Sequence, residues 1–359
     1  MGEKQRVTVA MSGGVDSSVA ALLAKKSGND VRGIYMRTWH SDDTFSPLGD
    51  CPWKRDSEDA RRVAERIGID FEIVNMIDFY EKFVVKPLID GYRGGITPNP
   101  DILCNQFVKF GVLAEIARGK GSVALATGHY CKKRKNTDGT FDLIEPRDKS
   151  KDQTYFLAYL RQEQIQFAAF PIADLTKSEV RALAEKAGLA TAKKKDSQGI
   201  CFLGKVKIQD FLAHYIEKNP GNIINSAGEI VGRHEGLHNF TIGQRHGLNI
   251  PSNSDYNFYV VIGKDLERNE LEVAFEGEKK LYKNRFKIYN LSHTNRALPE
   301  RCEFSCRPRY RDPQQRIYFE KTSPREAIIE FKRPQRALSS GQVVAFYEGE
   351  VLLGGGIYA

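Results

Sequence analysis

The sequence predicts an α/β protein built on a doubly wound parallel sheet, followed by a part made of short β segments. In the first third of the chain, short apolar runs alternate with amphipathic helical patterns, as in a parallel sheet covered by helices. A glycine-rich turn joins the first apolar run to the first helical pattern. After Pro220, brief β-branched runs separated by turn residues favour an antiparallel barrel or two small β modules.

The predicted elements follow this order along the chain. Strands are expected at 7–11, 31–36, 71–74 and 123–127, and helices at 19–26, 55–67 and 77–89. A hairpin is expected at 130–145, with its turn at 136–139. Helical patterns cover 151–187 and 207–218, and β segments cover 259–262, 271–273, 286–288, 316–319, 327–331 and 343–347. Because the glycine turn, Met36 and Gly128 all follow strands, we expect them to line one crevice at the carboxyl edge of the sheet.

The glycine turn Ser12-Gly13-Gly14-Val15-Asp16-Ser17-Ser18 is the strongest single signal. Gly13 and Gly14 permit a tight turn, and the N–H groups at the following helix start suit a phosphate. We place Asp16 or Ser17 near the N-cap of that helix. The turn lacks the lysine of a Walker loop and the GxGxxG dinucleotide pattern. It resembles the pyrophosphate loop of enzymes that split ATP into AMP and pyrophosphate; the alternative is a turn that merely starts a helix.

The length and the net charge limit the number of domains and the kind of partner that we expect. At 359 residues, the chain has room for two or three domains of roughly 150 residues each. The net charge of +8 favours a polyanionic partner, nucleic acid first, over a generic basic surface. The basic run Lys132 to Lys135 is either a nucleic-acid contact or a solvated strand. We find no signal peptide and no apolar stretch of about 18 residues, so we expect a soluble intracellular protein.

Two of the six cysteines stand in polar, loop-like surroundings. A helix starting near Asn105 would place Cys104 at its N-terminus, where the helix dipole favours a thiolate. Asp101 would face the same pocket as a general acid or base. Cys201 lies in a polar loop that runs into an apolar segment. For either cysteine alone the plainer interpretation is a buried, inert thiol, and the cysteine spacing gives little support to a zinc site.

Further motifs occur in a fixed order along nearly the whole chain, and together they carry a resemblance. After the glycine turn come the segments 99–105 (NPDILCN), 126–130 (ATGHY), 151–157 (KDQTYFL), 196–202 (DSQGICF), 241–245 (TIGQR), 307–311 (RPRYR) and 340–342 (SGQ). The chain thereby resembles the bacterial tRNA-specific 2-thiouridylase family. This resemblance implies a catalytic ATP-pyrophosphatase domain of the adenine nucleotide alpha hydrolase-like fold at 1–206. It also implies a small central domain at 207–279 and a C-terminal β-barrel that contacts tRNA at 280–359.

The resemblance also implies a mechanism. ATP adenylylates the C2 oxygen of an everted wobble uridine (position 34), and pyrophosphate departs. Cys201 carries sulfur as a persulfide, which attacks C2 directly or after reduction to hydrosulfide. Cys104 breaks the S–S bond and forms a disulfide with Cys201, which a reductant resets. Asp101 is the candidate proton carrier.

The residues that the resemblance assigns fall into two sets. ATP binding is expected at Ala10, Met11, Ser12, Gly13, Gly14, Val15, Asp16, Ser17, Met36 and Gly128. Contact with tRNA is expected at Asn99, Pro100, Asp101, His129, Lys151, Asp152, Gln153, Arg309, Tyr310 and Gln342. We expect no protein metal cage, with Mg²⁺ held through ATP phosphates and water. Cys51 is given no catalytic role, with a redox or packing role left open, and Cys131, Cys302 and Cys306 are interpreted as structural.

The expected partners are a tRNA with a wobble uridine and a sulfur donor, either a sulfur-relay protein or a cysteine desulfurase. We expect a monomer in the bacterial cytoplasm, or in an organelle after loss of a transit peptide. Two rival functions remain open. One is another pyrophosphate-loop ligase that acts on tRNA, such as a lysidine synthetase, which would not need two spaced cysteines. The other is a non-catalytic RNA-binding protein with a dead nucleotide fold.

Overall fold

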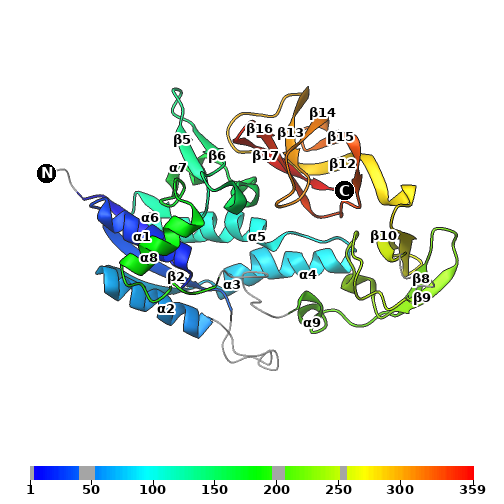
Figure 1. The fold of residues 1–359 in the computed structure, drawn as a ribbon, viewed down its shortest axis with the longest axis horizontal. Coiled ribbons are helices and arrows are strands. Elements are labelled where there is room, and N and C mark those ends of the chain that lie inside the picture. Colours follow the sequence, from blue (N-terminus) through cyan, green and yellow to red (C-terminus); the bar gives the residue numbers. More distant parts are fainter. Residues whose placement is uncertain (1–3, 40–52, 196–206, 251–256) are drawn as a thin grey trace.

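The computed structural model describes residues 4–39, 53–195, 207–250 and 257–359. A parallel sheet with its helices forms one end of the molecule, and two β-rich parts form the other (Figure 1). The positions of Cys51 and Cys201, and the rest of the segment 196–202, lie outside the described residues.

The parallel sheet has the strand order β3-β2-β1-β4-β7. Its strands are β1 (Arg6–Ala10), β2 (Asp30–Arg37), β3 (Asp70–Asn75), β4 (Ala124–Ala126) and β7 (Ala168–Ala169). All neighbouring pairs run parallel, which confirms the predicted fold class. The chain order reverses between β1 and β4, so the crevice beyond their carboxyl ends is the expected ligand site of such a sheet.

Helices cover both faces of this sheet, because its strands are apolar on both sides. Val9 belongs to one core, which α1 (Val15–Lys26), α2 (Trp53–Ile67) and α8 (Lys177–Lys186) complete. Ile34 and Leu125 belong to the core on the other face. That core is completed by the stretch α3 (Ile77–Tyr80), η2 (Glu81–Val85) and α4 (Lys86–Arg93), and by α5 (Pro100–Leu103), η3 (Cys104–Leu113) and α6 (Ala114–Gly119).

Two predicted helix starts are wrong by a few residues. Helix α1 begins at Val15 with Gly14 as its N-cap, so Asp16 and Ser17 lie inside the first turn. The helix that carries Cys104 begins at Pro100 and not near Asn105. Proline suits the first helical position, and the Asn99 side chain accepts hydrogen bonds from the next backbone N–H groups. Cys104 therefore lies beyond the first turn, so the helix-dipole argument for its reactivity loses its basis.

The continuous helical pattern predicted over 151–187 is also wrong. The structure has the short turns η4 (Lys149–Lys151) and η5 (Thr154–Leu157), then α7 (Gln162–Phe167), strand β7 and helix α8. The apolar residues Tyr155, Leu157 and Leu160 are buried in the core shared with the barrel strands, rather than on one helical face. The helix predicted over 207–218 is limited to α9 (Ile208–Leu212).

The second half contains both of the β arrangements that the pattern left open. A four-stranded sheet has the order β10-β11-β8-β9, from β8 (Gly221–Ile224), β9 (Ile230–His234), β10 (Tyr259–Asp265) and β11 (Glu270–Phe275). A six-stranded antiparallel barrel follows, from β12 (Tyr282–His293), β13 (Arg301–Arg307), β14 (Gln315–Ser323), β15 (Glu326–Arg336), β16 (Val343–Glu348) and β17 (Val351–Tyr358). It closes because β12 pairs with both β15 and β17.

Strands β8, β9, β13 and β17 were not predicted. Strand β17 contains three consecutive glycines, Gly354 to Gly356, which lowers its apparent β-propensity. At Gly355 a Cβ atom would lie 2.7 Å from the Val344 carbonyl oxygen, so glycine permits the close approach of the strands.

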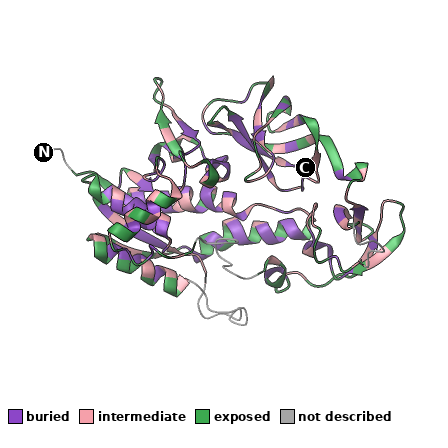
Figure 2. Ribbon diagram, viewed as in Figure 1, coloured by how far each residue is buried: buried purple, intermediate pink, exposed green. Residues whose placement is uncertain are grey.

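The predicted hairpin is confirmed as β5 (Lys132–Lys135) and β6 (Phe141–Ile144). Strand β6 also pairs with β17, so one sheet runs from the part of the molecule that holds the parallel sheet into the barrel. Leu143 on β6 and Leu352 on β17, which pair with each other, are both buried, and buried residues occur in both parts of the molecule (Figure 2). The basic side chains of β5 make intramolecular contacts: Lys132 pairs with Asp174, and Arg134 with Asp142.

Candidate active site

The glycine turn forms a tight, preorganised loop between β1 and α1. Gly13 has φ +71°, and a Cβ atom there would lie 2.1 Å from the Asp56 carbonyl oxygen, so no other residue fits. The Ser17 hydroxyl accepts a hydrogen bond from the Ser12 backbone N–H at 3.1 Å. It donates to the Gly14 carbonyl, also at 3.1 Å. These bonds fix the loop in a shape that suits an anion at the start of α1.

A salt bridge and a hydrogen bond hold the acidic residue of this loop. The carboxylate of Asp16 accepts hydrogen bonds from Lys177 Nζ at 2.7 and 2.8 Å and from the Tyr130 hydroxyl at 3.0 Å. Lys177 is the first residue of α8, after the N-cap Thr176. Sequence reasoning missed Lys177 and Tyr130, because only the fold brings them to the loop.

The other predicted ATP residues lie at the same edge of the sheet. Gly128 follows β4, and a Cβ atom there would lie 2.6 Å from the Ser17 backbone nitrogen. Glycine is therefore required for the contact between the end of β4 and the loop. Met36 lies on the neighbouring strand β2, two residues beyond Ile34, whose carbonyl accepts a hydrogen bond from Met11. The structure thus brings all ten predicted ATP residues to one edge.

Helix α5 and the first residue of η3 carry the predicted catalytic residues of the first cysteine motif. Asn99 is its N-cap and Pro100 its first residue. Asp101 is half-buried, and Cys104 is 3% exposed. Burial raises the pKa of Asp101, and the nearby Lys109 ammonium opposes part of that rise. A half-buried carboxyl with a raised pKa is suited to proton transfer.

A lysine, an asparagine and a histidine form a polar cluster beside α5. Lys109 Nζ donates to Asn105 Oδ1 at 2.8 Å and lies 3.5 Å from His129 Nε2. His129 Nδ1 is 2.8 Å from the Thr127 hydroxyl oxygen. Burial and the Lys109 charge together hold the pKa of His129 well below its usual range, so the ring is neutral near pH 7. Lys109 was not predicted, although its spacing of four from Asn105 and eight from Asp101 places them on one side of the helix.

The barrel contacts the loop that precedes α5. Gln342 Nε2 donates to the Thr97 carbonyl at 2.7 Å, and the Thr97 N–H donates to the Ser340 carbonyl at 2.9 Å. The ring of Tyr310 lies 4.3 Å from that of Phe156, centroid to centroid. Arg309 donates to the Ala337 carbonyl at 2.8 Å. Three predicted tRNA residues therefore lie on barrel segments that also make intramolecular contacts.

The predicted segment 151–153 contributes one buried ion pair. Asp152 is 8% exposed and pairs with Arg307 at 3.3 Å, and Arg307 also pairs with Glu145 at 2.6 Å. Gln153 Oε1 accepts a hydrogen bond from the backbone N–H of Tyr130 at 2.9 Å. Lys151 is half-buried at the end of η4. This segment connects the barrel with the end of β4, where His129 lies.

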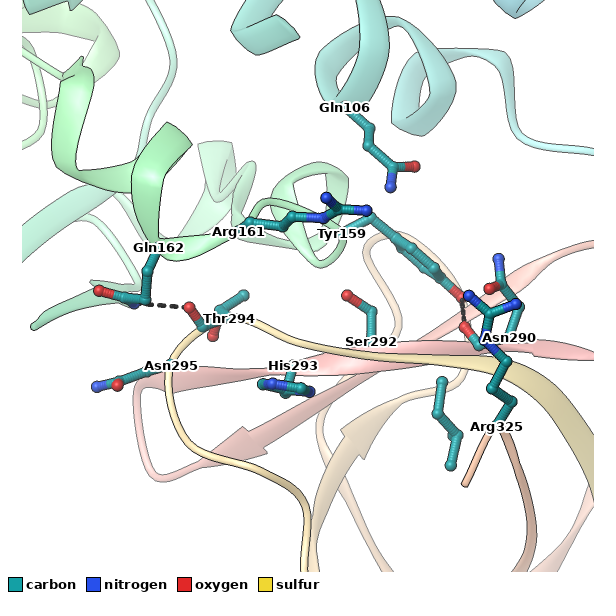
Figure 3. A pocket seen from close by; sticks show the side chains of 11 residues that line it. Gln106, Tyr159, Arg161, Gln162, Asn290, Ser292, His293, Thr294, Asn295 and Arg325 are labelled. Carbon is teal, nitrogen blue, oxygen red and sulfur yellow. Dashed lines mark hydrogen bonds between the residues drawn. The ribbon is translucent and has the colours of Figure 1, made fainter. Parts of the chain in front are cut away.

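A polar groove lies between the barrel strand β12 and the segment that precedes and begins α7. It has a volume of about 370 Å³, and its walls include Arg161, Arg325 and His293. Two hydrogen bonds cross its floor, from the Tyr159 hydroxyl to the Asn290 carbonyl and from Gln162 Nε2 to the Thr294 carbonyl (Figure 3). Both bonds join the two parts of the molecule.

Burial raises the pKa of the thiols of Cys131, Cys302 and Cys306, which favours the inert protonated form. Within the described ranges, no group of three or more His, Cys, Asp or Glu side chains is placed to hold a metal ion. No helix in those ranges is long and apolar enough to cross a membrane.

Comparison with known proteins identifies the family to which this chain belongs. Residues 5–205 match the family model described as a tRNA methyl transferase HUP domain. Residues 209–275 match a tRNA methyl transferase PRC-barrel domain, and 283–358 an aminomethyltransferase beta-barrel domain. A tRNA-specific 2-thiouridylase MnmA from Akkermansia muciniphila is 46% identical over 98% of both chains. The chain belongs to the tRNA-specific 2-thiouridylase family.

Other members of the 2-thiouridylase family give the same result. The MnmA protein of Bacillus velezensis is 44% identical and covers 99% of this chain and 95% of its own. That of Streptococcus sanguinis is 42% identical with the same coverage. Among solved structures, NMN synthetase from Francisella tularensis is 16% identical over 59% of this chain and 77% of its own, with a TM-score of 0.35.

Proposed function

We propose that this protein is an ATP-dependent tRNA-uridine 2-sulfurtransferase that makes 2-thiouridine at the wobble position (position 34) of tRNA. One observation carries the proposal. A relative named tRNA-specific 2-thiouridylase is 46% identical over 98% of both chains, and this chain has the glycine loop, the half-buried Asp101 and the buried Cys104 that the family resemblance implies.

The first step activates a poor leaving group. ATP binds with its pyrophosphate at the glycine turn, where Gly13, Gly14 and the start of α1 direct N–H groups toward an anion. The C2 oxygen of the uracil attacks the α-phosphorus, and the bond from that phosphorus to pyrophosphate breaks. Asp101 accepts the N3 proton of the uracil as its C2 oxygen becomes a nucleophile. The products are adenylylated uridine and pyrophosphate.

The second step replaces the oxygen with sulfur. Cys201 carries a persulfide, and its outer sulfur attacks C2 either directly or after release as hydrosulfide. The bond from C2 to oxygen breaks, and AMP leaves with that oxygen. In the direct route Cys104 then attacks the sulfur of Cys201 and the S–S bond breaks, which leaves a Cys104–Cys201 disulfide. The thiocarbonyl is freed as Asp101 returns the proton to N3. An external reductant restores both thiols, and a sulfur-relay protein or a cysteine desulfurase supplies the next sulfur.

The tRNA residues act from two sides of the site. Asn99, Pro100 and Asp101 at the start of α5, with His129, face the target base. Lys151, Asp152 and Gln153, with Arg309, Tyr310 and Gln342 of the barrel, support the anticodon loop. Loop bases are already splayed, so the wobble uridine is everted at low cost. Asp152 and Gln342 contribute by holding other residues in place, because their side chains make intramolecular contacts.

The proposal also covers the metal ion, the oligomeric state, the cellular compartment and the division into domains. Mg²⁺ reaches the site with ATP, through phosphate and water ligands, because Asp16, the carboxylate of the loop, is paired with Lys177. The protein acts as a monomer in the bacterial cytoplasm. The domain division is 1–206 for catalysis, 207–279 for the central part and 280–359 for the barrel.

Mass spectrometry of the modified tRNA tests this function. Purified protein is incubated with ATP, Mg²⁺, a sulfur donor and unmodified tRNA, and the digested tRNA is searched for 2-thiouridine. We expect ATP-dependent 2-thiouridine and AMP in the wild type. Cys104→Ser, and Cys201→Ser with a persulfide donor, lose the product, whereas the control Cys302→Ser retains it. AMP without a thionucleoside would indicate another ligase, and tRNA binding without pyrophosphate would indicate a non-catalytic RNA-binding protein.

A further inference from the structure

Lys109 is a half-buried cation that the proposed mechanism does not use. In the described part of the chain, its ammonium nitrogen contacts Asn105 and His129 and makes no ion pair with a carboxylate. Taking an ammonium group out of water is costly unless an opposite charge or strong hydrogen bonds compensate. Its direct contacts are neutral, and the Asp101 carboxyl, on whose pKa its charge acts, forms no ion pair with it in the described residues, so Lys109 is suited to binding an anion.

Its neighbours are held so that they do not neutralise it. The amide nitrogen of Asn105 donates to the Phe156 carbonyl at 3.2 Å, which turns Oδ1 toward Lys109. Asn105 is 3% exposed, so this orientation is fixed. His129 is held at its other ring nitrogen by Thr127. Asn105 and His129 therefore hold the Lys109 ammonium group in a fixed position without neutralising its charge.

The fold places this cluster beside the predicted ATP loop. His129 directly follows Gly128, which lies against the backbone of Ser17 at the start of α1. The cluster thus lies at the switch point between β1 and β4, next to the loop that is suited to pyrophosphate. The next phosphoryl group of ATP toward the nucleoside is the α-phosphoryl group.

We propose that Lys109 binds the α-phosphoryl group of the nucleotide, with Asn105 as the residue that positions its ammonium. This inference rests on the proposed function and assigns a ligand to a residue outside the predicted set. In the first step, negative charge gathers on the α-phosphoryl oxygens as the bond to the C2 oxygen forms and the bond to pyrophosphate breaks. In the second, AMP leaves with the C2 oxygen, and Lys109 stabilises its charge. Lys109 gives up no proton in either step.

Binding of AMP and of adenosine, measured by calorimetry on the full-length protein, tests the contact directly. The two ligands differ by the phosphoryl group alone. We expect the wild type to prefer AMP, and Lys109→Met to lose roughly 10- to 100-fold of AMP affinity while its adenosine affinity stays unchanged. Lys109→Arg keeps part of the preference because it keeps the charge. Lys120→Met is the matched control. Lys120 lies between α6 and β4, at the opposite edge of the sheet, and pairs with Glu72.

A second variant removes the charge without removing the lysine. Asn105→Asp has nearly the same size and places a carboxylate where Oδ1 now lies 2.8 Å from Lys109 Nζ. We expect it to weaken AMP binding as Lys109→Met does. In both variants, the tRNA-dependent rate of pyrophosphate release should fall by about 10²- to 10³-fold, as when one donor to a developing anion is removed.

The outcomes separate this inference from the function on which it rests. Unchanged AMP affinity in Lys109→Met would overturn the inference, as would a loss of tRNA affinity alone, which would assign the cation to a phosphodiester of the tRNA. Equal losses for AMP and adenosine would also overturn it, because they would indicate a structural role. A wild type that forms no 2-thiouridine, yet loses its AMP preference in Lys109→Met, would support the Lys109 contact and reject the proposed reaction.

Discussion

In this site, burial and neighbouring charges change the pKa values of single residues. Asp101 keeps its proton to a higher pH than an ordinary aspartate, because burial raises its pKa above 3.8. The charged group that acts on this carboxyl is Lys109, on the same helical stretch. Lys109 opposes part of the pKa rise, so it favours the carboxylate that the proposed proton transfer requires.

The pH dependence of the adenylylation step tests the role of Asp101. The rate of pyrophosphate release should fall as the pH drops through the raised pKa of Asp101, because only the carboxylate accepts a proton. In Lys109→Met the acidic limb should move to higher pH, since the opposing charge is gone. Asp101→Asn should lower the rate by about 10²- to 10⁴-fold.

The matched control is Asp90→Asn, an exposed aspartate on α4 that pairs with Arg93. It should leave the pH profile unchanged. An acidic limb that stays in place in both Lys109→Met and Asp101→Asn would contradict the assignment of this limb to Asp101.

At the scale of elements, the site depends on where strands end and helices begin. The glycine turn could be predicted because the full segment Ser12 to Ser18 lies between an apolar run and a helical pattern. The start of the Cys104 helix was misplaced, because Asn99 and Pro100 were interpreted as a loop although they also fit an N-cap and a first helical position. Lys109, Lys177 and Tyr130 were missed, because only tertiary contacts bring them to the loop.

The contact between the end of β4 and the glycine turn gives a prediction at this scale. Gly128→Ala would place a methyl group 2.6 Å from the Ser17 backbone nitrogen, so the loop must shift. We expect ATP affinity to fall by at least tenfold, measured by calorimetry. Gly119→Ala is the control, because a Cβ atom there meets nothing within 4 Å. Equal ATP affinity in the two variants would show that this contact does not position the loop.

At the scale of the whole molecule, the barrel is joined to the catalytic part by a shared sheet and by a buried ion-pair network. The network joins Arg307 on β13, Glu145 after β6 and Asp152, and Lys149 extends it by pairing with Glu145 at 3.3 Å. Burial alone would raise the pKa of Glu145, but the hydrogen bonds from Arg307 and Gln314 outweigh it, so the pKa is lowered. The resemblance predicted a barrel that contacts tRNA, but composition and spacing could not predict these contacts, because Arg307 lies far from Glu145 in the sequence.

Removing one charge of this network should destabilise the molecule. Glu145→Gln leaves Arg307 partly unpaired in a buried position, with an expected cost of about 3–5 kcal/mol in the free energy of unfolding. The control Glu303→Gln alters an exposed pair with Arg316, outside this network, and should cost at most about 1 kcal/mol. Denaturant unfolding measures both, and equal small costs would contradict the role of the network.

The pH dependence of stability follows from the same carboxylate. Because its pKa is lower in the folded protein, Glu145 stabilises the fold above its unfolded pKa, near 4.5. That contribution is lost as the pH falls below 4.5 and through the lowered pKa. Stability measured from pH 7 downward should therefore decline less steeply in Glu145→Gln than in the wild type; an identical decline would contradict the assignment.

The central claim is that the C2 oxygen of the wobble uridine is adenylylated and then leaves with AMP. The most direct test uses a tRNA whose wobble uridine carries a heavy oxygen isotope at C2, followed by mass spectrometry of the AMP. The account predicts that each AMP released with a 2-thiouridine carries the heavy oxygen in its phosphoryl group. Unlabelled AMP alongside 2-thiouridine would contradict it, because the α-phosphoryl group of ATP would then have been transferred to an atom other than the C2 oxygen.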